Sequence, residues 1–177
     1  MGGRDKAFLA LAGRPLIAHA VSRLRPQVDA LVINSNGDPA RFAEYRLPVI
    51  ADILSGHQGP LAGIHAGLTY DPQAYLVAVA VDIPFLPADL VARLRANLGT
   101  ARCAYASNGR HHALALLWAP GALTLLEEYL ASGERSIKKF LAEHGAAVLF
   151  DRPGDADLFH NLNTPEDLAR AEQGGLL

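Results

Sequence analysis

The sequence contains only one cysteine, Cys103, among its 177 residues. A lone cysteine excludes an internal disulfide and any zinc site that needs several thiolates, and it fits a reducing compartment, so we predict a cytoplasmic protein. Long hydrophobic runs are also missing, because no apolar stretch approaches the ~20 residues of a membrane-spanning helix, and the first residues lack the pattern of a signal peptide. We therefore expect no membrane partner.

An excess of positive charge is missing as well. The chain has 16 Lys and Arg residues against 18 Asp and Glu residues, which gives a net charge of -2. Because the basic residues are scattered and form no patch, we expect no nucleic-acid partner. Hydrophobic residues make up 50% of the chain, enough at this length to bury one sizeable core. Since no linker or repeat interrupts the sequence, we predict a single domain over residues 1–177.

The most informative stretch is an apolar run at residues 74–81 (AYLVAVAV), which Asp82 and Ile83-Pro84 follow. A run without polar alternation is typical of a strand that is covered on both faces in a parallel sheet, which makes it a central strand. A carboxylate at the C-terminal end of such a strand lies where open α/β sheets bind their ligands. Asp82 is therefore the first candidate for a metal or phosphate site, and the alternative is that it only begins a turn or caps the next helix.

Strand and helix patterns alternate along the first half of the chain, which is typical of an α/β protein with a doubly wound, mostly parallel sheet. In the second half, Asn108-Gly109 between two apolar runs predicts a tight hairpin and so a small antiparallel excursion. Near the C-terminus, Thr164, Pro165 and Asp167 resemble a helix-capping box. The expected helices lie at residues 15–26, after 37, and at 59–68, 87–98, 119–131, 134–144 and from 164; the expected strands lie at 31–33, 49–51, 74–81, 103–106, 112–118 and 147–150.

Polar residues follow three of the predicted strands: Asn34, Asp52 and Asp82. Parallel strands bring such ends to one edge of a sheet, so we expect the three side chains to form one site rather than three separate turns. A lone carboxylate repels phosphate, so Asp82 needs a hard cation. Mg²⁺, which one or two carboxylates hold together with water and phosphate oxygens, fits best. These residues predict a nucleotide-binding site with Asp82 as the metal ligand.

Three other segments each have two interpretations. Residues 2–6 (GGRDK) offer close backbone approach and two cations, or form only a flexible terminus. Gly59, Pro60 and Gly63 start a helix that either lets a ligand approach the backbone or packs closely on the sheet. The charged helix face that contains Arg135 is either solvated or meets an anionic substrate.

Seven segments of the chain, taken in order, carry a resemblance to a known family. They are MGGRDK, LAGRPLIAHAVSRL, PQVDALVINSN, LPVIAD, GPLAGI, VDIPFLP and NLNTPEDLARA. In this order and spacing they resemble the molybdenum cofactor guanylyltransferase family over essentially the whole chain. The resemblance implies a Rossmann-like nucleotidyltransferase fold that joins the GMP part of GTP to molybdopterin, or to its molybdenum-loaded form, and releases pyrophosphate. It also implies Mg²⁺ as cofactor and a molybdoenzyme or cofactor-insertion protein as a partner.

The resemblance assigns roles by position in this sequence. It implies that Lys6 binds the phosphates of GTP and that Asp82 holds Mg²⁺, and we expect these two residues to be catalytic. Asn34 and Asp52 correspond to groups near the base and ribose of the nucleotide. Asn163 and its neighbour Asn161 correspond to groups that lie near the pterin or support the metal. The substrate-binding candidates are Gly59, Pro60, Gly63, Arg135, Asn161 and Asn163.

The family begins with a strand, a Leu-Ala-Gly-Gly loop and a downstream arginine, ahead of the position where this chain starts. The resemblance therefore implies a domain that lacks the first strand and the Gly-rich loop, with the true start upstream. Because that loop helps to read the base, two alternatives stay open. One is a cytidylyltransferase that acts on the same pterin, and the other is a non-catalytic accessory protein that binds a nucleotide or a pterin.

Overall fold

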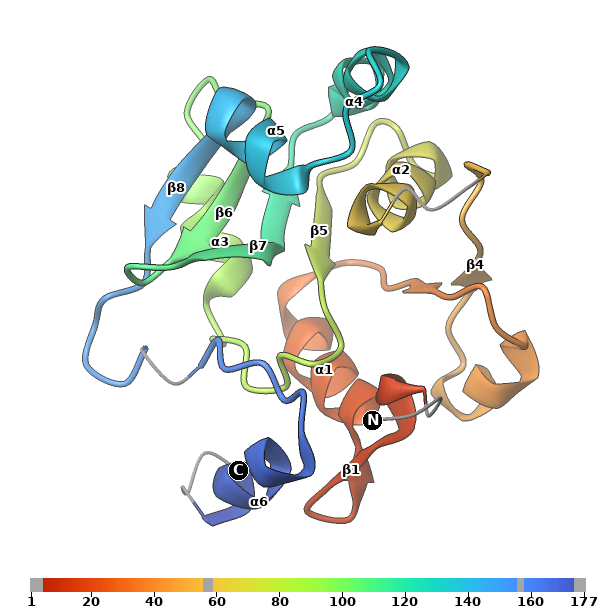
Figure 1. Cartoon of the computed structure of the whole chain (residues 1–177), viewed down its shortest axis with the longest axis vertical. Helices are drawn as coiled ribbons and strands as arrows, with labels where there is room; N and C mark the ends of the chain where they lie inside the picture. Colours follow the sequence, from red (N-terminus) through yellow and green to blue (C-terminus); the bar gives the residue numbers. More distant parts are fainter. Residues whose placement is uncertain (1–4, 56–58, 156–157, 174–177) are drawn as a thin grey trace.

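The computed structural model describes residues 5–55, 59–155 and 158–173 (Figure 1). Of the predicted GGRDK segment, residues 2–4 lie outside the described residues. The strands are β1 (Ala10–Leu11), β2 (Arg14–Pro15), β3 (Ile33–Asn34), β4 (Val49–Ile50), β5 (Leu76–Val79), β6 (Cys103–Ser107), β7 (His111–Trp118) and β8 (Gly145–Leu149). The α-helices are α1 (Leu16–Leu24), α2 (Pro60–Tyr70), α3 (Leu90–Ala96), α4 (Ala122–Ala131), α5 (Ile137–His144) and α6 (Pro165–Gln173), and the short 3₁₀ helices are η1 (Lys6–Phe8), η2 (Arg25–Gln27) and η3 (Pro39–Tyr45).

The strands pair in three groups. β1 and β2 form an antiparallel pair, and β3 and β4 form a parallel pair. The other four strands form a sheet in the order β5-β7-β6-β8, in which β7 is antiparallel to both of its neighbours and β6 is parallel to β8. Within the described ranges, the β3–β4 pair shares no strand with this four-stranded sheet.

The position of β5 differs from the prediction that it is the central strand of a parallel sheet. In the described part of the chain β5 pairs only with β7, which is antiparallel to it, and all four of its residues are half-buried. The antiparallel neighbour of β5 results from the hairpin at Asn108-Gly109. This hairpin was predicted correctly, and Gly109 lies in it at φ +87°. It returns the chain as β7 between β5 and β6. The antiparallel excursion therefore lies inside this sheet, and the parallel pairs are β3–β4 and β6–β8.

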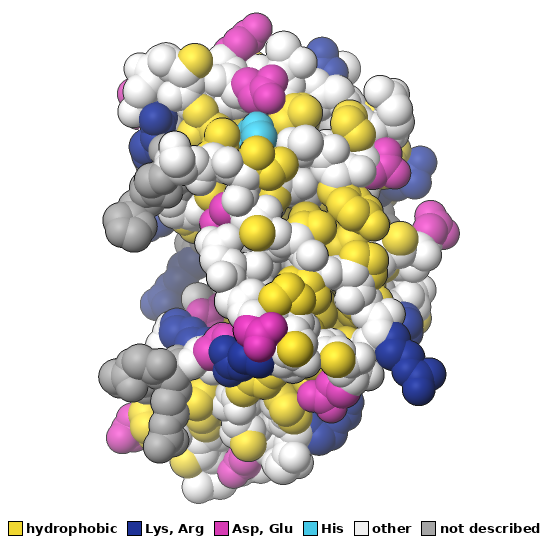
Figure 2. All heavy atoms as spheres, turned by 90° about the vertical axis from the view of Figure 1, so that its right-hand side faces the viewer, with side chains coloured by type: hydrophobic (Ala, Val, Ile, Leu, Met, Phe, Trp, Pro, Cys, Tyr) yellow, Lys and Arg dark blue, Asp and Glu magenta, His cyan; other side chains and the backbone are white. Residues whose placement is uncertain are grey.

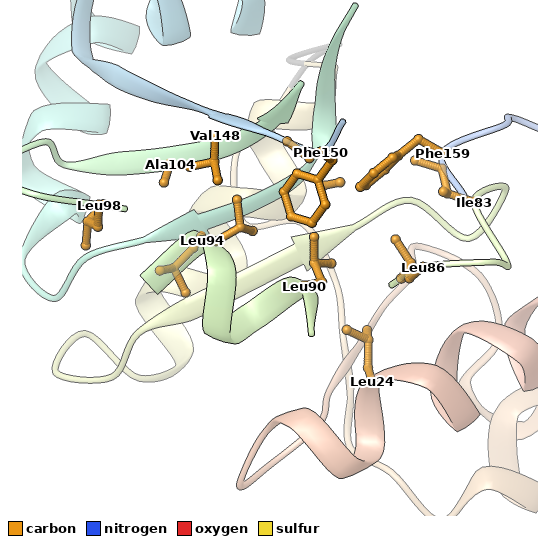
Figure 3. Close-up of a cluster of buried hydrophobic side chains, with 13 residues drawn as sticks. Leu24, Ile83, Leu86, Leu90, Leu94, Leu98, Ala104, Val148, Phe150 and Phe159 are labelled. Carbon is orange, nitrogen blue, oxygen red and sulfur yellow. The ribbon is translucent and has the colours of Figure 1, made fainter. Parts of the chain in front are cut away.

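Residues of β6 and β7 alternate between two buried hydrophobic clusters, as successive side chains of a strand point to opposite faces. Ala104 and Leu117 lie in the cluster with α3, which Figure 3 shows with Leu90 and Leu94 pointing toward the sheet. Cys103 and Trp118 lie in the cluster with α2, α4 and α5. Helices thus cover both faces of the sheet, and the three-layer arrangement is confirmed.

A third hydrophobic cluster joins the two ends of the chain. It contains Leu11 of β1, Leu16 of α1, Phe85 from the loop after β5, Leu162, and Ala171 of α6. Leu11, Leu16 and Leu162 are completely buried. This packing brings the N-terminal hairpin and the C-terminal helix to the loop that follows Asp82, at the lower end of the view in Figure 1.

Helix α6 begins with the predicted capping box. The Thr164 side-chain oxygen accepts a hydrogen bond from the backbone N–H of Asp167 at 3.0 Å, and Asp167 Oδ2 accepts one from the backbone N–H of Thr164 at 2.9 Å. The two bonds satisfy backbone donors that a helix start leaves without partners. Among the helices in the described ranges, none has the length and apolar character needed to cross a membrane.

Candidate functional site

Three residues from distant parts of the sequence meet around the ammonium group of Lys6. Lys6 lies in η1, Asp82 follows β5, and Asn163 precedes α6. Lys6 Nζ donates to Asn163 Oδ1 at 2.5 Å and to Asp82 Oδ2 at 3.3 Å. We call these three residues the lysine cluster. An ammonium carries three N–H donors, and among the described residues only these two acceptors bind them, so the third N–H can bind an anion.

Asp82 is held at the cluster by the backbone on both sides. The N–H of Ile83 donates to the carbonyl of Ala80 at 3.2 Å and closes a tight turn. The carbonyl of Asp82 itself accepts the N–H of Leu162 at 2.9 Å, so the segment before α6 lies beside the end of β5. The Asp82 side chain is 15% exposed, and its buried Oδ1 atom has no hydrogen-bond partner in the part of the chain that is described.

The polar residues after β3 and β4 form a second group. Asp52 Oδ1 accepts a hydrogen bond from Asn34 Nδ2 at 3.0 Å, and Asp52 Oδ2 accepts one from Asn36 Nδ2 at 2.8 Å. The N–H of Asp52 donates in return to Asn36 Oδ1 at 2.8 Å. We call Asn34, Asn36 and Asp52 the amide–carboxylate cluster. It brings together two of the three strand-end residues that the sequence placed in one site, and the third, Asp82, makes its hydrogen bonds in the lysine cluster.

Gly63 of α2 packs directly on the amide–carboxylate cluster. A Cβ atom built on Gly63 would lie well within 3.0 Å of Asn34 Oδ1, closer than real Cβ atoms come to a neighbour. Gly59 precedes α2 with φ +58°, a backbone conformation that glycine adopts readily, and Pro60 is the first helical residue. Close packing of α2 on the strand ends, one of the two interpretations of this segment, is therefore present.

Arg135 lies away from both clusters, near a pocket of about 410 Å³ between α2 and α4. Arg135 Nη1 donates to the backbone carbonyls of Leu130 and Glu134, and His65 Nε2 lies 3.4 Å from Glu127 Oε1. Figure 2 shows this face of the molecule, where a histidine lies among hydrophobic and acidic side chains. The pocket is lined by Leu54, His65, Glu127, Leu130, Ala131 and Arg135. Arg135 thus binds one carbonyl at the C-terminal end of α4 and one in the loop after it, and the structure does not bring it to Lys6 or Asp82.

Two ionisable groups in or near the core have shifted pKa values that bear on the chemistry. Burial raises the pKa of the Cys103 thiol to about 12, so the thiol stays protonated at neutral pH and is a poor nucleophile. The hydrogen bond from the backbone N–H of Asn163 is the main cause that lowers the pKa of Asp167 to about 2. Asp167 is therefore a carboxylate beside the lysine cluster at any physiological pH.

The donor set for a metal ion is small. Within the described ranges, no group of three or more His, Cys, Asp and Glu side chains lies together in a way that could hold a metal ion through protein ligands alone. Asp82 is the carboxylate of the lysine cluster, and its Oδ1 oxygen is unpaired there. Such a site fits a cation that takes most of its ligands from water and phosphate, as Mg²⁺ does, and does not fit zinc.

Two residues of the site were not predicted as site residues: Asn36, which belongs to the amide–carboxylate cluster, and Asp167, which binds the backbone of the lysine cluster. Asn36 was not predicted, although its place two residues after Asn34 puts both amides near the same strand end. Asp167 was read only as a helix cap, although it also receives the backbone N–H of Asn163 at 3.0 Å. Asn161, a predicted pterin contact, is exposed at the surface two residues before Asn163.

Comparison with known proteins finds relatives over nearly the whole chain. Residues 1–148 match the MobA-like NTP transferase domain family. The chain is 48% identical to a molybdenum cofactor guanylyltransferase of Cereibacter sphaeroides, over 97% of this chain and 89% of that protein. It is 44% identical to the Serratia proteamaculans protein of the same name, over 98% of this chain and 88% of that one.

Solved structures give the same result for the fold. Molybdopterin-guanine dinucleotide biosynthesis protein A from Archaeoglobus fulgidus is similar with a TM-score of 0.75 and 25% identity, over 97% of this chain and 90% of that chain. A 4-diphosphocytidyl-2C-methyl-D-erythritol synthase from Anaerococcus prevotii shares the fold at 12% identity, with a TM-score of 0.73 over 98% of this chain and 91% of that one. These similarities confirm the α/β nucleotidyltransferase fold that the sequence predicted.

Proposed function

This chain belongs to the MobA-like NTP transferase family, among the molybdenum cofactor guanylyltransferases, and we propose that it transfers GMP from GTP to molybdopterin with release of pyrophosphate. The observation that carries the proposal is the lysine cluster, in which the Lys6 ammonium lies between Asp82 and Asn163 and keeps one N–H donor without an acceptor in the described part of the chain. An ammonium that two acceptors hold in place is suited to bind a triphosphate. The product would be a guanine dinucleotide form of the cofactor.

The chemistry needs positioning more than it needs a reactive side chain. The terminal phosphate of molybdopterin attacks the α-phosphorus of GTP in line, and pyrophosphate leaves. Neither reactant requires a protein nucleophile, which agrees with the protonated, buried thiol of Cys103. Phosphoryl transfer of this kind is accelerated mainly by holding the two phosphates in line and by neutralising charge. Lys6 would do the second by donating its free N–H to a phosphate oxygen.

Asp82 would hold Mg²⁺ through Oδ1, the oxygen that is unpaired among the described residues, while Oδ2 stays with Lys6. When bound, the cation would neutralise phosphate charge that the Asp82 carboxylate alone would repel. Water and phosphate oxygens would supply the other ligands. This assignment is supported by the chemistry of the donor set, since one carboxylate with a free oxygen suits Mg²⁺ in a nucleotide complex.

The remaining predicted residues would divide between the two substrates. Asn34 and Asp52 of the amide–carboxylate cluster would contact the base and ribose of GTP, because carboxylate and amide oxygens keep lone pairs for further donors. Asn163, with Asn161 beside it, would contact the pterin. Gly59 and Pro60 would admit the nucleotide to the start of α2. The reaction would take place in the cytoplasm, where a molybdoenzyme or a cofactor-insertion protein would receive the product.

The test is pyrophosphate release from GTP or CTP in the presence of molybdopterin, with and without Mg²⁺. Release with GTP and Mg²⁺, and little with CTP, supports guanylyl transfer. Release with CTP alone would replace the proposal with a cytidylyltransferase, and nucleotide binding without any release would replace it with a binding protein. Lys6→Gln should lower the rate, and Lys138→Gln is the matched control, because Lys138 is exposed on α5.

A further inference from the structure

We propose that Asp167 is a positioning residue for Lys6, because it fixes the backbone of Asn163 and so sets the acceptor that holds the Lys6 ammonium beside Asp82. The kinetic part of this inference rests on the proposed guanylyl transfer, and the structural part does not. Asp167 lies in α6, beyond residues 1–148 that match the domain family.

The Asp167 carboxylate accepts hydrogen bonds from three donors, two of them in the segment before α6 and one in α6 itself. Oδ2 accepts the backbone N–H of Asn163 at 3.0 Å and of Thr164 at 2.9 Å, and Oδ1 accepts Arg170 Nη2 at 2.5 Å. The side chain is only 12% exposed. A helix cap usually receives donors of its own first turn, whereas the bond to Asn163 reaches back beyond Thr164 into the lysine cluster.

Asn163 lies between two fixed points of the chain. On one side, Leu162 is completely buried and donates its N–H to the carbonyl of Asp82. On the other side, Thr164 is bound to Asp167 in the capping box. With its own N–H also on Asp167, the backbone of Asn163 has little freedom, so its side-chain oxygen stays 2.5 Å from Lys6 Nζ.

A second contact places α6 relative to the segment that carries Lys6. Glu172 Oε1, near the end of α6, accepts the backbone N–H of Ala12 at 2.8 Å, in the turn between β1 and β2. Ala171 packs in the cluster that contains Leu11. Donor and acceptor of the Lys6–Asn163 bond therefore belong to elements that are packed together, and Asp167 sets the position of the acceptor.

The first experiment measures how reactive Lys6 is toward an acylating reagent. The sequence has three lysines, and exposed Lys138 serves as the internal reference for peptide mass spectrometry. A hydrogen-bonded ammonium reacts slowly, so we expect the Lys6 to Lys138 labelling ratio to rise about fivefold or more in Asp167→Ala. Glu166→Ala, which removes the same charge from an exposed position of the same turn, should leave the ratio unchanged. Equal ratios in the two variants would overturn the proposal.

The second experiment is a double-mutant cycle on pyrophosphate release. Asp167→Ala and Asn163→Ala should each lower kcat by about tenfold or more, with GTP affinity within about threefold of wild type, since the nucleotide keeps its other contacts. If Asp167 acts through Asn163, the double variant is no slower than the slower single variant. Additive losses would show that Asp167 acts otherwise and would overturn the proposal, whereas a merely structural role would change stability and GTP affinity instead.

The two experiments separate this inference from the proposed function. If the wild-type protein releases no pyrophosphate, the proposed function fails, and the labelling ratio still decides whether Asp167 positions Lys6. If Asp167→Ala does not fold, Asp167→Asn replaces it, because the amide keeps one oxygen for the N–H of Asn163 and loses the charge that holds Arg170. That variant keeps the bond to Asn163, so its labelling ratio should stay within about twofold of the wild-type ratio. A rise of about fivefold or more would contradict the proposal, because it would show that the Asp167 charge, and not the bond to Asn163, holds Lys6.

Discussion

Gly63 of α2 lies against the side-chain oxygen of Asn34, and the space between them is too small for a Cβ atom. Gly63→Ala must therefore displace Asn34 from Asp52 or push α2 away from the strand ends. Loss of one hydrogen bond to a carboxylate costs about 1–2 kcal/mol, so we expect GTP binding to weaken roughly five- to thirtyfold, as measured by calorimetry. Gly67→Ala is the matched control, because its new Cβ would meet only the flexible Leu76 side chain. Equal effects of the two variants would contradict the account of Gly63.

Asn36 holds the Asp52 carboxylate from the side opposite to Asn34. Asn36→Ala removes a side-chain donor and the acceptor for the Asp52 N–H, so Asp52 should lose its fixed orientation. We expect GTP affinity to fall by about 1–2 kcal/mol in the same calorimetric assay. Asn97→Ala, which removes an amide that donates to the Arg93 carbonyl of its own helix, should leave the affinity unchanged.

The pH dependence of stability should report on Asp167. Its pKa falls from an ordinary value of 3.8 to about 2 in the folded chain, so its contribution to stability is present above the ordinary value and is lost as pH falls through about 2. We therefore expect the Tm difference between wild type and Asp167→Asn to be constant from neutral pH down to about pH 5 and to close toward about pH 2. Glu166→Gln should show no such change. A Tm difference between wild type and Asp167→Asn that stays the same at about pH 2 would contradict the lowered pKa of Asp167.

Cys103 should be dispensable for catalysis. Its thiol is completely buried, and burial raises its pKa to about 12. Cys103→Ala should keep pyrophosphate release near the wild-type rate and lower stability by about 1 kcal/mol, measured by denaturant unfolding. Inactivation of the folded protein by a thiol reagent, at a rate faster than unfolding, would contradict this prediction.

Local sequence patterns predicted where strands and helices lie better than they predicted which strands pair with one another. The apolar run at residues 74–81 predicts a strand, because burial on both faces leaves no polar alternation, but the identity of the adjacent strand depends on where the later hairpin returns. Asn108-Gly109 specifies the turn itself and not the position of β7 between β5 and β6. The doubly wound prediction therefore gives the layers correctly and the direction of the strand beside β5 incorrectly.

In the candidate site, too, contacts between neighbouring strand ends could be predicted, and contacts between distant parts of the chain could not. Asn34 and Asp52 follow adjacent parallel strands, so their contact could be predicted from the sequence. The bond between Lys6 and Asn163 joins residues separated by 157 positions, and it depends on packing between the N-terminal hairpin and α6 that no local pattern encodes. The role proposed for Asp167 was hidden for this reason, since the sequence shows only the cap.

Asp82 and Lys6 together are proposed to serve guanylyl transfer. The most direct measurement is a single-turnover assay with GTP, molybdopterin and Mg²⁺, in which mass spectrometry identifies the product formed by wild type, Asp82→Asn and the control Asp151→Asn, whose residue is exposed. We expect wild type and the control each to form one guanine dinucleotide product for every pyrophosphate released. Folded Asp82→Asn should form that product at least about a hundredfold more slowly. Formation of that product by folded Asp82→Asn at the wild-type rate would contradict the account.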